Sequence, residues 1–177
     1  MHRQILKDGK NLVLNSIVRH IPSWTLRRIC YKYFGMKIGN DARIGIRTYV
    51  LEPEQIVIGE RSIVNSDCML DGRGGIVIEH DVSISQYTKI ITGSHKKNSG
   101  TFEYYTRPVL IQDHVWVGVS AIILLNSKIG KNAIIGAGCV FKGTCNKNAI
   151  MIGNPAKKIG DRELEDEYVK DYKTFFI

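Results

Sequence analysis

The chain has 177 residues, of which 44% are hydrophobic, and a net charge of +8 at neutral pH. This length fits a single domain. No apolar run approaches the roughly twenty residues that span a bilayer, and the N-terminus lacks the compact apolar core of a signal peptide, so a cytoplasmic protein is expected. The positive charge favours anionic partners. Because the basic residues are spread out and no nucleic-acid-binding module is recognisable, nucleic acid is not expected among them.

Residues 1–37 are predicted to form a helical segment. The apolar face of a first helix ends before Pro22 and comprises Val13, Leu14, Ile17, Val18 and Ile21. Ser23 is a candidate cap for a second helix, which Gly35 closes. The side chains expected to face inward on this second helix are Leu26, Ile29, Cys30 and Phe34.

Basic side chains concentrate in the same segment. They are Arg19, Arg27, Arg28, Lys32 and Lys37. A basic amphipathic helix can rest on anionic lipid, so peripheral contact with the inner face of a membrane is one interpretation. A solvated charged face is the other, and the sequence does not decide between the two.

A six-residue period runs through the rest of the chain. Its large apolar positions from residue 111 onward are Ile111, Val117, Ile123, Ile129, Ile135 and Phe141. A smaller residue follows each of them by four places, namely Val115, Ala121, Ser127, Ala133, Cys139 and Cys145. A period of six residues fits neither an α-helix nor an alternating strand. It is typical of short strands joined by turns, which together wind the chain into a three-sided prism. The pattern predicts an all-β fold, a left-handed parallel β-helix over residues 38–160.

Three earlier blocks show the same period and restart after small offsets. Their large positions are Ile38, Ile44, Val50 and Ile56, then Ile58, Val64, Leu70 and Ile76, then Ile78, Ile84 and Ile90. The restarts are interpreted as two-residue bulges at Val57, Val77 and Leu110, which would lengthen the first two coils to about twenty residues. Glu54 does not fit the repeat.

The cysteines and histidines give little support for a metal site. Cys68, Cys139 and Cys145 occupy the small interior position, which suits reduced thiols, and no paired metal-ligand spacing is present. His80 and His114 are expected in outward turn positions. Neither a disulfide nor a metal is predicted.

The longest interruption of the six-residue period covers residues 96–108, between His95 and the coil that begins near Ile111. A long excursion from a regular scaffold is usually functional, and the two tyrosines of this one, Tyr104 and Tyr105, argue against a passive linker. We expect it to fold over a site. His95 stands at its start, where a rigidly held imidazole could act as a general base, although a histidine at a loop start is by itself more often structural.

The repeat ends at the C-terminal side in Gly153-Asn154-Pro155-Ala156, where Pro155 fixes a turn. Residues 161–177 carry Leu164, Tyr168 and Tyr172 in helical register and are predicted to form a short C-terminal helix. These flanking segments are expected to cover the open ends of the prism.

Several ordered motifs on this repeat resemble a known family. They are Ile84-Ser85-Gln86, Thr92-Gly93-Ser94-His95, Val115-Trp116-Val117-Gly118, Gly136-Ala137-Gly138 and Gly153-Asn154-Pro155-Ala156. Over residues 39–159 the chain resembles the hexapeptide-repeat acyltransferases, in particular O-acetyltransferases of bacterial exopolysaccharide, colanic-acid and capsule biosynthesis, which are related to maltose and galactoside acetyltransferases. The resemblance implies acetyl-coenzyme A as donor, a homotrimer with sites between neighbouring prisms, and direct attack of an acceptor hydroxyl on the thioester.

The resemblance also implies roles for individual residues. His95 matches the general base, and Asn65 matches an asparagine that orients the acetyl or acceptor group, with a polar turn residue as the alternative reading. Asp71 and Tyr104 are candidates for binding the acceptor. The backbone N–H of Val119 matches the oxyanion donor.

The resemblance places Ala137 along the pantetheine arm of coenzyme A and Asn154, Pro155 and Ala156 near its adenine. Lys142 and Lys157 are candidate cations for the phosphates, with ordinary surface lysines as the alternative. Trp116 departs from the composition of the repeat and is expected to project outward, onto the pantetheine arm or the acceptor pocket, with packing at the trimer interface as the alternative.

The sequence thus predicts an acetyl-coenzyme A-dependent O-acetyltransferase that modifies a sugar hydroxyl in bacterial surface polysaccharide biosynthesis. One alternative is an acyltransferase that acts on an amino sugar nitrogen, a serine or an antibiotic. An alternative of a different class is a β-helix scaffold or binding module without catalysis.

Overall fold

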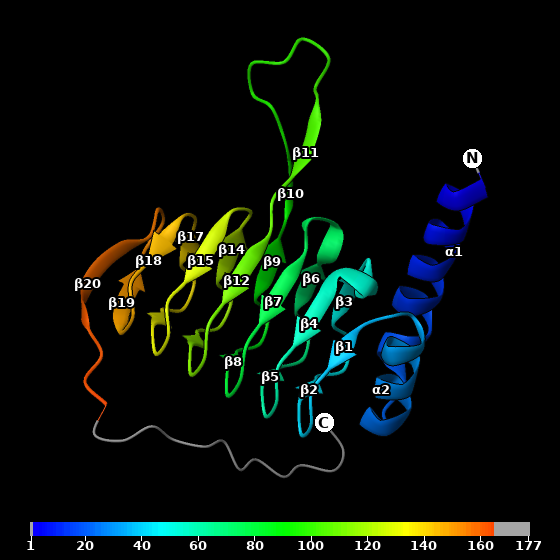
Figure 1. Cartoon of the computed structure of the whole chain (residues 1–177), viewed down its shortest axis with the longest axis horizontal. Helices are drawn as coiled ribbons and strands as arrows, with labels where there is room; N and C mark the ends of the chain where they lie inside the picture. The colour runs from blue at the N-terminus through cyan, green and yellow to red at the C-terminus, as the bar shows by residue number, and fades with distance from the viewer. Residues whose placement is uncertain (1, 165–177) are drawn as a thin grey trace.

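The computed structural model describes residues 2–164, with side chains from residue 8 onward. Three sheets, parallel except for the last strand of one of them, form the faces of a three-sided prism, which Figure 1 shows as a row of stacked coils with the helices at one end. The predicted left-handed parallel β-helix is confirmed. The first sheet contains, in spatial order, β1 (Lys37–Ile38), β4 (Ile56–Ile58), β7 (Ile76–Ile78), β12 (Val109–Ile111), β15 (Ser127–Ile129) and β18 (Thr144–Cys145).

The other two sheets complete each coil. The second contains β2 (Arg43–Ile44), β5 (Ile63–Val64), β8 (Ser83–Ile84), β13 (Trp116–Val117), β16 (Ile134–Ile135), β19 (Ala149–Ile152) and β20 (Lys157–Asp161). The third contains β17 (Val140–Phe141), β14 (Ile122–Leu124), β9 (Lys89–Ile91), β6 (Met69–Asp71) and β3 (Tyr49–Leu51). We call the first, second and third sheets A, B and C. Corner BC is then the corner between the second and third sheets, and corner CA is the corner between the third and first sheets.

The hexad residues build the core as predicted. The large positions Ile44, Ile84 and Phe141 are at most 1% exposed, and so are the small positions Ala42 and Ala121. Stacking places identical positions of successive coils against one another, so each coil buries its interior side chains on its neighbours. This stacking stabilises strands that are too short to be stable alone.

The two extra residues of the early coils do not form bulges, contrary to the prediction. Ile38 pairs with Ile58 and Ile58 with Ile78, twenty residues apart each time, and the strands keep a regular register through Val57. The additional residues lie at corner CA instead, in the 3-10 turns η2 (Pro53–Gln55) and η3 (Gly72–Gly74). A corner can lengthen without disturbing strand pairing, which explains why Glu54 departs from the repeat.

The N-terminal segment forms α1 (His2–Ser16), the 3-10 turn η1 (Val18–His20) and α2 (Trp24–Tyr33). The Ser23 side chain accepts a hydrogen bond from the Leu26 N–H at 3.5 Å, as expected for the cap. Gly35 ends the helix with a φ of +94°, a conformation that glycine adopts without a steric cost.

The predicted inward faces of these helices are wrong in part. Leu14 of α1 and Val18 of η1 are buried, but Val13 and Ile17 are exposed. On α2 the buried residues are Arg27 and Tyr31, whereas Leu26 and Ile29 are 53% and 60% exposed and Cys30 and Phe34 are half-buried.

The helix α2 buries a different side from the predicted one because of Arg27, whose guanidinium lies between the helix and the first coil. It donates hydrogen bonds to the carbonyl oxygens of Ile21, of Pro22 at 2.9 Å and of Ile44 at 3.0 Å. The bond to the Ile44 carbonyl oxygen is buried, and buried carbonyl groups need a donor, so α2 turns Arg27 inward at the junction with the coil and leaves Leu26 and Ile29 exposed.

At the other end, β20 turns back and pairs antiparallel with β19. Asp161 is the last residue of this strand, and the rest of the predicted helix over 161–177 lies almost entirely outside the described residues. None of the helices in the described part of the chain is long and apolar enough to cross a membrane.

Candidate active site

The excursion over residues 96–108 begins and ends as a β-hairpin. Strand β10 (Gly93–His95) pairs with β11 (Tyr104–Thr106), with His95 opposite Tyr104. The sequence predicted an excursion that folds over a site. Figure 1 shows the hairpin projecting away from the row of coils, so it does not fold back over this chain. Residues at its base therefore remain accessible from outside the prism.

His95 is held by the hairpin itself. Its Nδ1 lies 2.7 Å from the carbonyl oxygen of Phe102, and its ring stacks on the Phe102 ring at 3.8 Å with an interplanar angle of 14°. The Tyr104 ring meets it edge-on at 5.3 Å. Because a carbonyl can only accept, Nδ1 carries the hydrogen and Nε2 of the neutral ring has the free electron pair. This is the arrangement that a general base requires.

Asp71, a predicted acceptor-binding residue, is fully buried beneath the hairpin. Its carboxylate accepts hydrogen bonds from Arg73 Nε at 2.7 Å and from Arg73 Nη2 at 2.9 Å, and from the Thr92 N–H at 3.2 Å. Burial opposes ionisation, but the bonds and charge of Arg73 and the backbone N–H groups of Arg73 and Thr92 outweigh it, so the pKa of Asp71 lies below its usual range.

Arg73 connects this carboxylate to the hairpin. Its guanidinium lies over the Tyr104 ring, 5.4 Å from the ring centre, and Tyr104 is the residue whose edge meets His95. A row of contacts therefore runs from Asp71 through Arg73 and Tyr104 to His95. Sequence reasoning missed Arg73 and Phe102, because an arginine two residues after an aspartate and a backbone carbonyl leave no trace in the repeat.

We predict that Asp71→Asn lowers the free energy of unfolding by about 1–3 kcal/mol at neutral pH, because it removes a buried charged hydrogen-bond acceptor. Since the folded-state pKa is depressed, this stabilisation is complete above the unfolded value of about 4 and is lost as pH falls through the folded value. Urea denaturation of both proteins at several pH values measures it.

The matched control for that experiment is Asp67→Asn. Asp67 accepts a similar pair of bonds from Arg47, but Arg47 is half exposed, so the expected loss is below about 1 kcal/mol. Equal losses in the two variants, or a gap between Asp71→Asn and wild type that persists unchanged below pH 3, would contradict the role of the buried pair.

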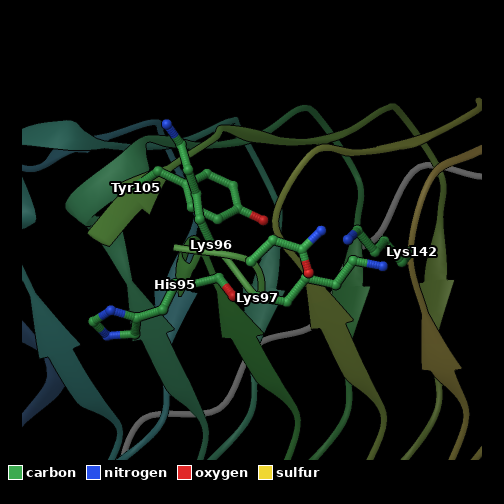
Figure 2. Close-up of a pocket in the computed structure, with 7 residues that line it drawn as sticks. His95, Lys96, Lys97, Tyr105 and Lys142 are labelled. Carbon is green, nitrogen blue, oxygen red and sulfur yellow. The ribbon is translucent and has the colours of Figure 1, made fainter. Parts of the chain in front are cut away.

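A cavity of about 520 Å³ opens beside the hairpin and is drawn in Figure 2. It is lined by Ser94, His95, Lys96, Lys97, Asn98, Tyr105 and Lys142. Lys96 pairs with Glu103 at 2.6 Å, whereas Lys97 and Lys142 have no carboxylate partner within residues 2–164. The imidazole of His95 points away from Lys97 and Lys142 (Figure 2). The cavity thus offers two free ammonium groups to an anion near the histidine.

A second group of predicted residues lies at corner BC. Asn65 follows β5, Val119 follows β13 and Ala137 follows β16, three strands of the second sheet. Within residues 2–164 the N–H groups of Val119 and Ala137 have no hydrogen-bond acceptor. Both residues are exposed, and their N–H groups are candidate donors to a ligand.

Two side chains complete this second group. The Asn65 amide donates to the Ile84 carbonyl oxygen at 2.8 Å, which orients it while leaving its own oxygen free of a described donor. Trp116 is 47% exposed and projects outward as predicted, and its Nε1–H donates to Ser85 Oγ at 3.3 Å.

The residues predicted to lie near the adenine end of coenzyme A follow β19. Asn154 and Pro155 are exposed in the turn, and the Ala156 N–H donates to the Val140 carbonyl oxygen at 3.0 Å. Lys157 begins β20 opposite Ile152 and is exposed. The turn thus lies at the C-terminal end of the prism.

The predicted catalytic residues do not meet within one chain. His95, Asp71 and Tyr104 lie at corner CA or on the hairpin that leaves it, and Lys142 follows β17 at the same corner. Asn65 belongs to corner BC, at the other end of the third sheet. Each chain therefore carries two separate groups of candidate residues.

Other titratable groups do not assemble a metal site. In the described part of the chain, no three His, Cys, Asp or Glu side chains are grouped as metal ligands would be. His80 is exposed as expected, but His114 is buried, because Arg162 covers the turn by donating to the His114 carbonyl oxygen. Cys68, Cys139 and Cys145 are free and buried, and burial raises the pKa of Cys68 to about 12.

No protein-family model matches the sequence. Individual proteins do. WcaF of Escherichia coli (strain K12), named as a colanic acid biosynthesis acetyltransferase, is 30% identical over 137 residues, which cover 77% of this chain and 75% of that protein. Galactoside O-acetyltransferase of the same strain is 27% identical over 173 residues, covering 94% of this chain and 84% of the relative.

Solved structures show the same fold. The hexapeptide-repeat acetyltransferase VCA0836 from Vibrio cholerae, complexed with acetyl-coenzyme A, superposes with a TM-score of 0.82 at 21% identity. The match covers 89% of this chain and 87% of that one.

The stacked three-sided coils define a left-handed parallel β-helix protein. With the relatives above, they show that the chain belongs to the hexapeptide-repeat acetyltransferase family. The protein is therefore an acyltransferase.

Proposed function

We propose that the protein is an acetyl-coenzyme A-dependent O-acetyltransferase that modifies a sugar hydroxyl in bacterial surface polysaccharide biosynthesis. The observation that carries the proposal is the contact between His95 Nδ1 and the Phe102 carbonyl oxygen at 2.7 Å, which presents Nε2 as a base. The colanic acid relative supports the polysaccharide, the galactoside enzyme supports a sugar hydroxyl, and the Vibrio cholerae complex supports acetyl-coenzyme A as donor.

In the proposed reaction, His95 Nε2 takes the proton from the acceptor hydroxyl as its oxygen attacks the thioester carbonyl carbon. The oxyanion that forms accepts a hydrogen bond from the Val119 N–H, which has no acceptor within residues 2–164. The carbon–sulfur bond then breaks, and the imidazolium returns its proton to the leaving sulfur. The products are the acetyl ester and the free thiol, without an acyl-enzyme.

The same proposal assigns the cofactor surface. Trp116 and the Ala137 N–H flank the pantetheine arm, and the turn at Asn154, Pro155 and Ala156 lies near adenine. Lys142 and Lys157 supply cations for the phosphates. The exposure of Lys142 and Lys157 and the free Ala137 N–H support this assignment.

The proposal includes a homotrimer, because corner CA and corner BC must come from different chains if His95 and Asn65 serve one site. In a cyclic trimer, corner CA of each chain can face corner BC of the next, which produces three equivalent sites. Asn65 would then orient the acetyl or acceptor group, and Asp71 would act through Arg73 and Tyr104 at the acceptor end. We further propose a cytoplasmic location, with peripheral contact at the inner face of the membrane.

Two other functions are distinguishable from this one. Acylation of an amino sugar nitrogen, a serine or an antibiotic would use the same base, so only the acceptor identifies it. A scaffold without catalysis would release no thiol from acetyl-coenzyme A under any condition.

The test is a screen for thiol release and acetyl transfer with nucleotide-linked and lipid-linked sugars as acceptors. A sugar acetyl ester among the products supports the proposal. Transfer to nitrogen alone, or to a serine or an antibiotic and no sugar, replaces it with the corresponding alternative. Binding of acetyl-coenzyme A without turnover on any acceptor favours the scaffold.

We predict that Lys142→Glu raises the KM for acetyl-coenzyme A about tenfold, because one phosphate contact is replaced by repulsion, and leaves kcat nearly unchanged. Initial rates at varied donor concentration measure both constants. Lys147→Glu, at an exposed turn outside the cavity, is the matched control and should keep the wild-type KM. An unchanged KM in Lys142→Glu would remove Lys142 from the cofactor site.

A further inference from the structure

The outer face of α1 carries exposed apolar side chains, including Val13 and Ile17, which the sequence predicted to be buried. From residue 9 to the residue after the helix, its exposed residues are Gly9, Leu12, Val13, Ser16 and Ile17, and the exposed Asp8 lies one turn before Leu12. With about 3.6 residues per turn, the five positions from Gly9 to Ile17 share one side of the helix. None of these five is charged, and Leu12 and Ile17 are 66% and 61% exposed. Soluble helices usually place charges on this side.

The outer face of α2 has the same character. Its exposed residues are Thr25, Leu26, Ile29, Lys32 and Tyr33, of which Lys32 alone is charged. Ile29 is 60% exposed and Tyr33 is 84% exposed. Arg27 and Tyr31 occupy the buried side, so the helix cannot turn Leu26 and Ile29 inward without removing Arg27 from the carbonyl oxygens it serves.

The excess positive charge of the protein gathers in this segment. Residues 1–37 contain eight Lys and Arg residues and one acid, Asp8, and so hold seven of the eight net charges. Lys10 is paired with Glu54 at 2.6 Å, and Arg27 is buried. Lys32 and Lys37 are exposed. Cations therefore accompany the exposed apolar side chains.

We propose that the outer faces of α1 and α2, called here the docking face, bind the surface of an anionic phospholipid bilayer, which builds on the peripheral membrane contact of the proposed function by naming the residues that make it. The docking face consists of Leu12, Val13, Ile17, Leu26, Ile29, Lys32 and Tyr33. Apolar side chains on interfacial helices insert at the boundary between headgroups and acyl chains, and nearby cations bind anionic headgroups.

The charge distribution favours a bilayer over a second copy of the chain. Two docking faces pressed together would bring two equally cationic segments into contact, whereas anionic lipid neutralises them. The position of the two helices at one end of the prism also allows the site to stay accessible when the protein is bound to a membrane. Figure 1 shows both helices at the β1 end of the prism and β20 at the opposite end, so docking leaves the hairpin and the corners of the later coils uncovered.

The experiment is co-sedimentation of the full chain with vesicles, without acetyl-coenzyme A, so the result does not depend on catalysis. One vesicle preparation is phosphatidylcholine, and the other also contains about 30% phosphatidylglycerol, to mimic an anionic leaflet. The test variants are the double variant Ile17→Ser, Ile29→Ser and the single variant Lys32→Glu. Their controls are Ile152→Ser, Ile159→Ser at exposed isoleucines of the β19 and β20 end, and Lys147→Glu. Circular dichroism checks that all of them fold.

We expect the wild type to sediment with the anionic vesicles and to remain largely in solution with phosphatidylcholine. The double variant should bind at least about tenfold more weakly, because each isoleucine loses the transfer free energy of a buried apolar side chain. Lys32→Glu should bind several-fold more weakly at low salt, a difference that concentrated salt should reduce. Both controls should bind as the wild type does.

Three results would overturn the proposal. One is a wild type that stays in solution with both vesicle preparations. Another is an equal loss of binding in the test and control variants. A third is a lipid-free assembly larger than a trimer that Ile17→Ser, Ile29→Ser abolishes, which would make the docking face a contact between protein chains.

Discussion

Replacing His95 by alanine is expected to lower the rate of acyl transfer by about 10²–10⁴-fold, the usual contribution of a positioned general base. The hydroxyl of a sugar is a weak nucleophile, and without Nε2 its proton has no acceptor as the carbon–oxygen bond forms. Release of coenzyme A thiol in the presence of a sugar acceptor measures the effect. The KM for acetyl-coenzyme A should change little, because the imidazole points away from Lys97 and Lys142.

His80→Ala is the matched control, since His80 is an exposed histidine at a turn between the first and second sheets. It should retain wild-type turnover. Wild-type turnover in His95→Ala would remove the histidine from the mechanism.

The coiled fold was predictable because one physical constraint repeats. Every sixth residue must fill the prism, and every coil offers the same limited room at its corners, so Ile111 to Cys145 show the period without error. The additional corner residues were misplaced for the same reason. A shift of the period shows that residues were added, but Ile56 and Ile58 are both interior, and nothing in the pattern says whether the extra length lies within the strand or before it.

The helix faces were less predictable because a single polar interaction decides them. Apolar periodicity favoured Leu26 and Ile29 as the buried side of α2. The carbonyl oxygens of Pro22 and Ile44, however, need a donor at the junction with the first coil, and Arg27 supplies it. Such a requirement arises only when the helix meets the coil, so it is not visible in either segment alone.

Some residues of the candidate site could be predicted from the sequence, and others depend on contacts that form only in the folded chain. His95 was found because the repeat stops there, and Trp116 because a large ring interrupts small residues. The Phe102 carbonyl that orients His95, and the Arg73 that joins Asp71 to Tyr104, depend on how the hairpin folds. The free N–H of Val119 is a backbone property and carries no side-chain signal. Resemblance to a family located these positions, while their roles stay predictions.

Two groups of residues at different corners make a single chain an incomplete enzyme under the proposed mechanism. Corner CA and its hairpin provide the base, and corner BC provides the amide and the oxyanion donor. Activity should then depend on assembly, and the dependence is measurable without a structure of the assembly. A monomeric enzyme with full activity would contradict it.

Mixed oligomers provide the sharpest measurement of this division. His95→Ala and Asn65→Ala are each expected to be nearly inactive, the second by about 10²-fold if its amide orients the reacting groups. In a cyclic trimer that contains both variants, one site in three receives an intact His95 from one chain and an intact Asn65 from the next. Co-expression with two different affinity tags, followed by sequential purification, isolates such trimers.

The mixed trimers should therefore recover a substantial fraction of wild-type turnover, far above that of either parent. The matched control combines His95→Ala with His95→Ala carrying the second tag, and it should stay inactive because no chain supplies the base. If His95 and Asn65 acted within one chain, no mixed trimer could contain a complete site. Activity no higher than the mean of the two parents would therefore show that the two corners do not share a site.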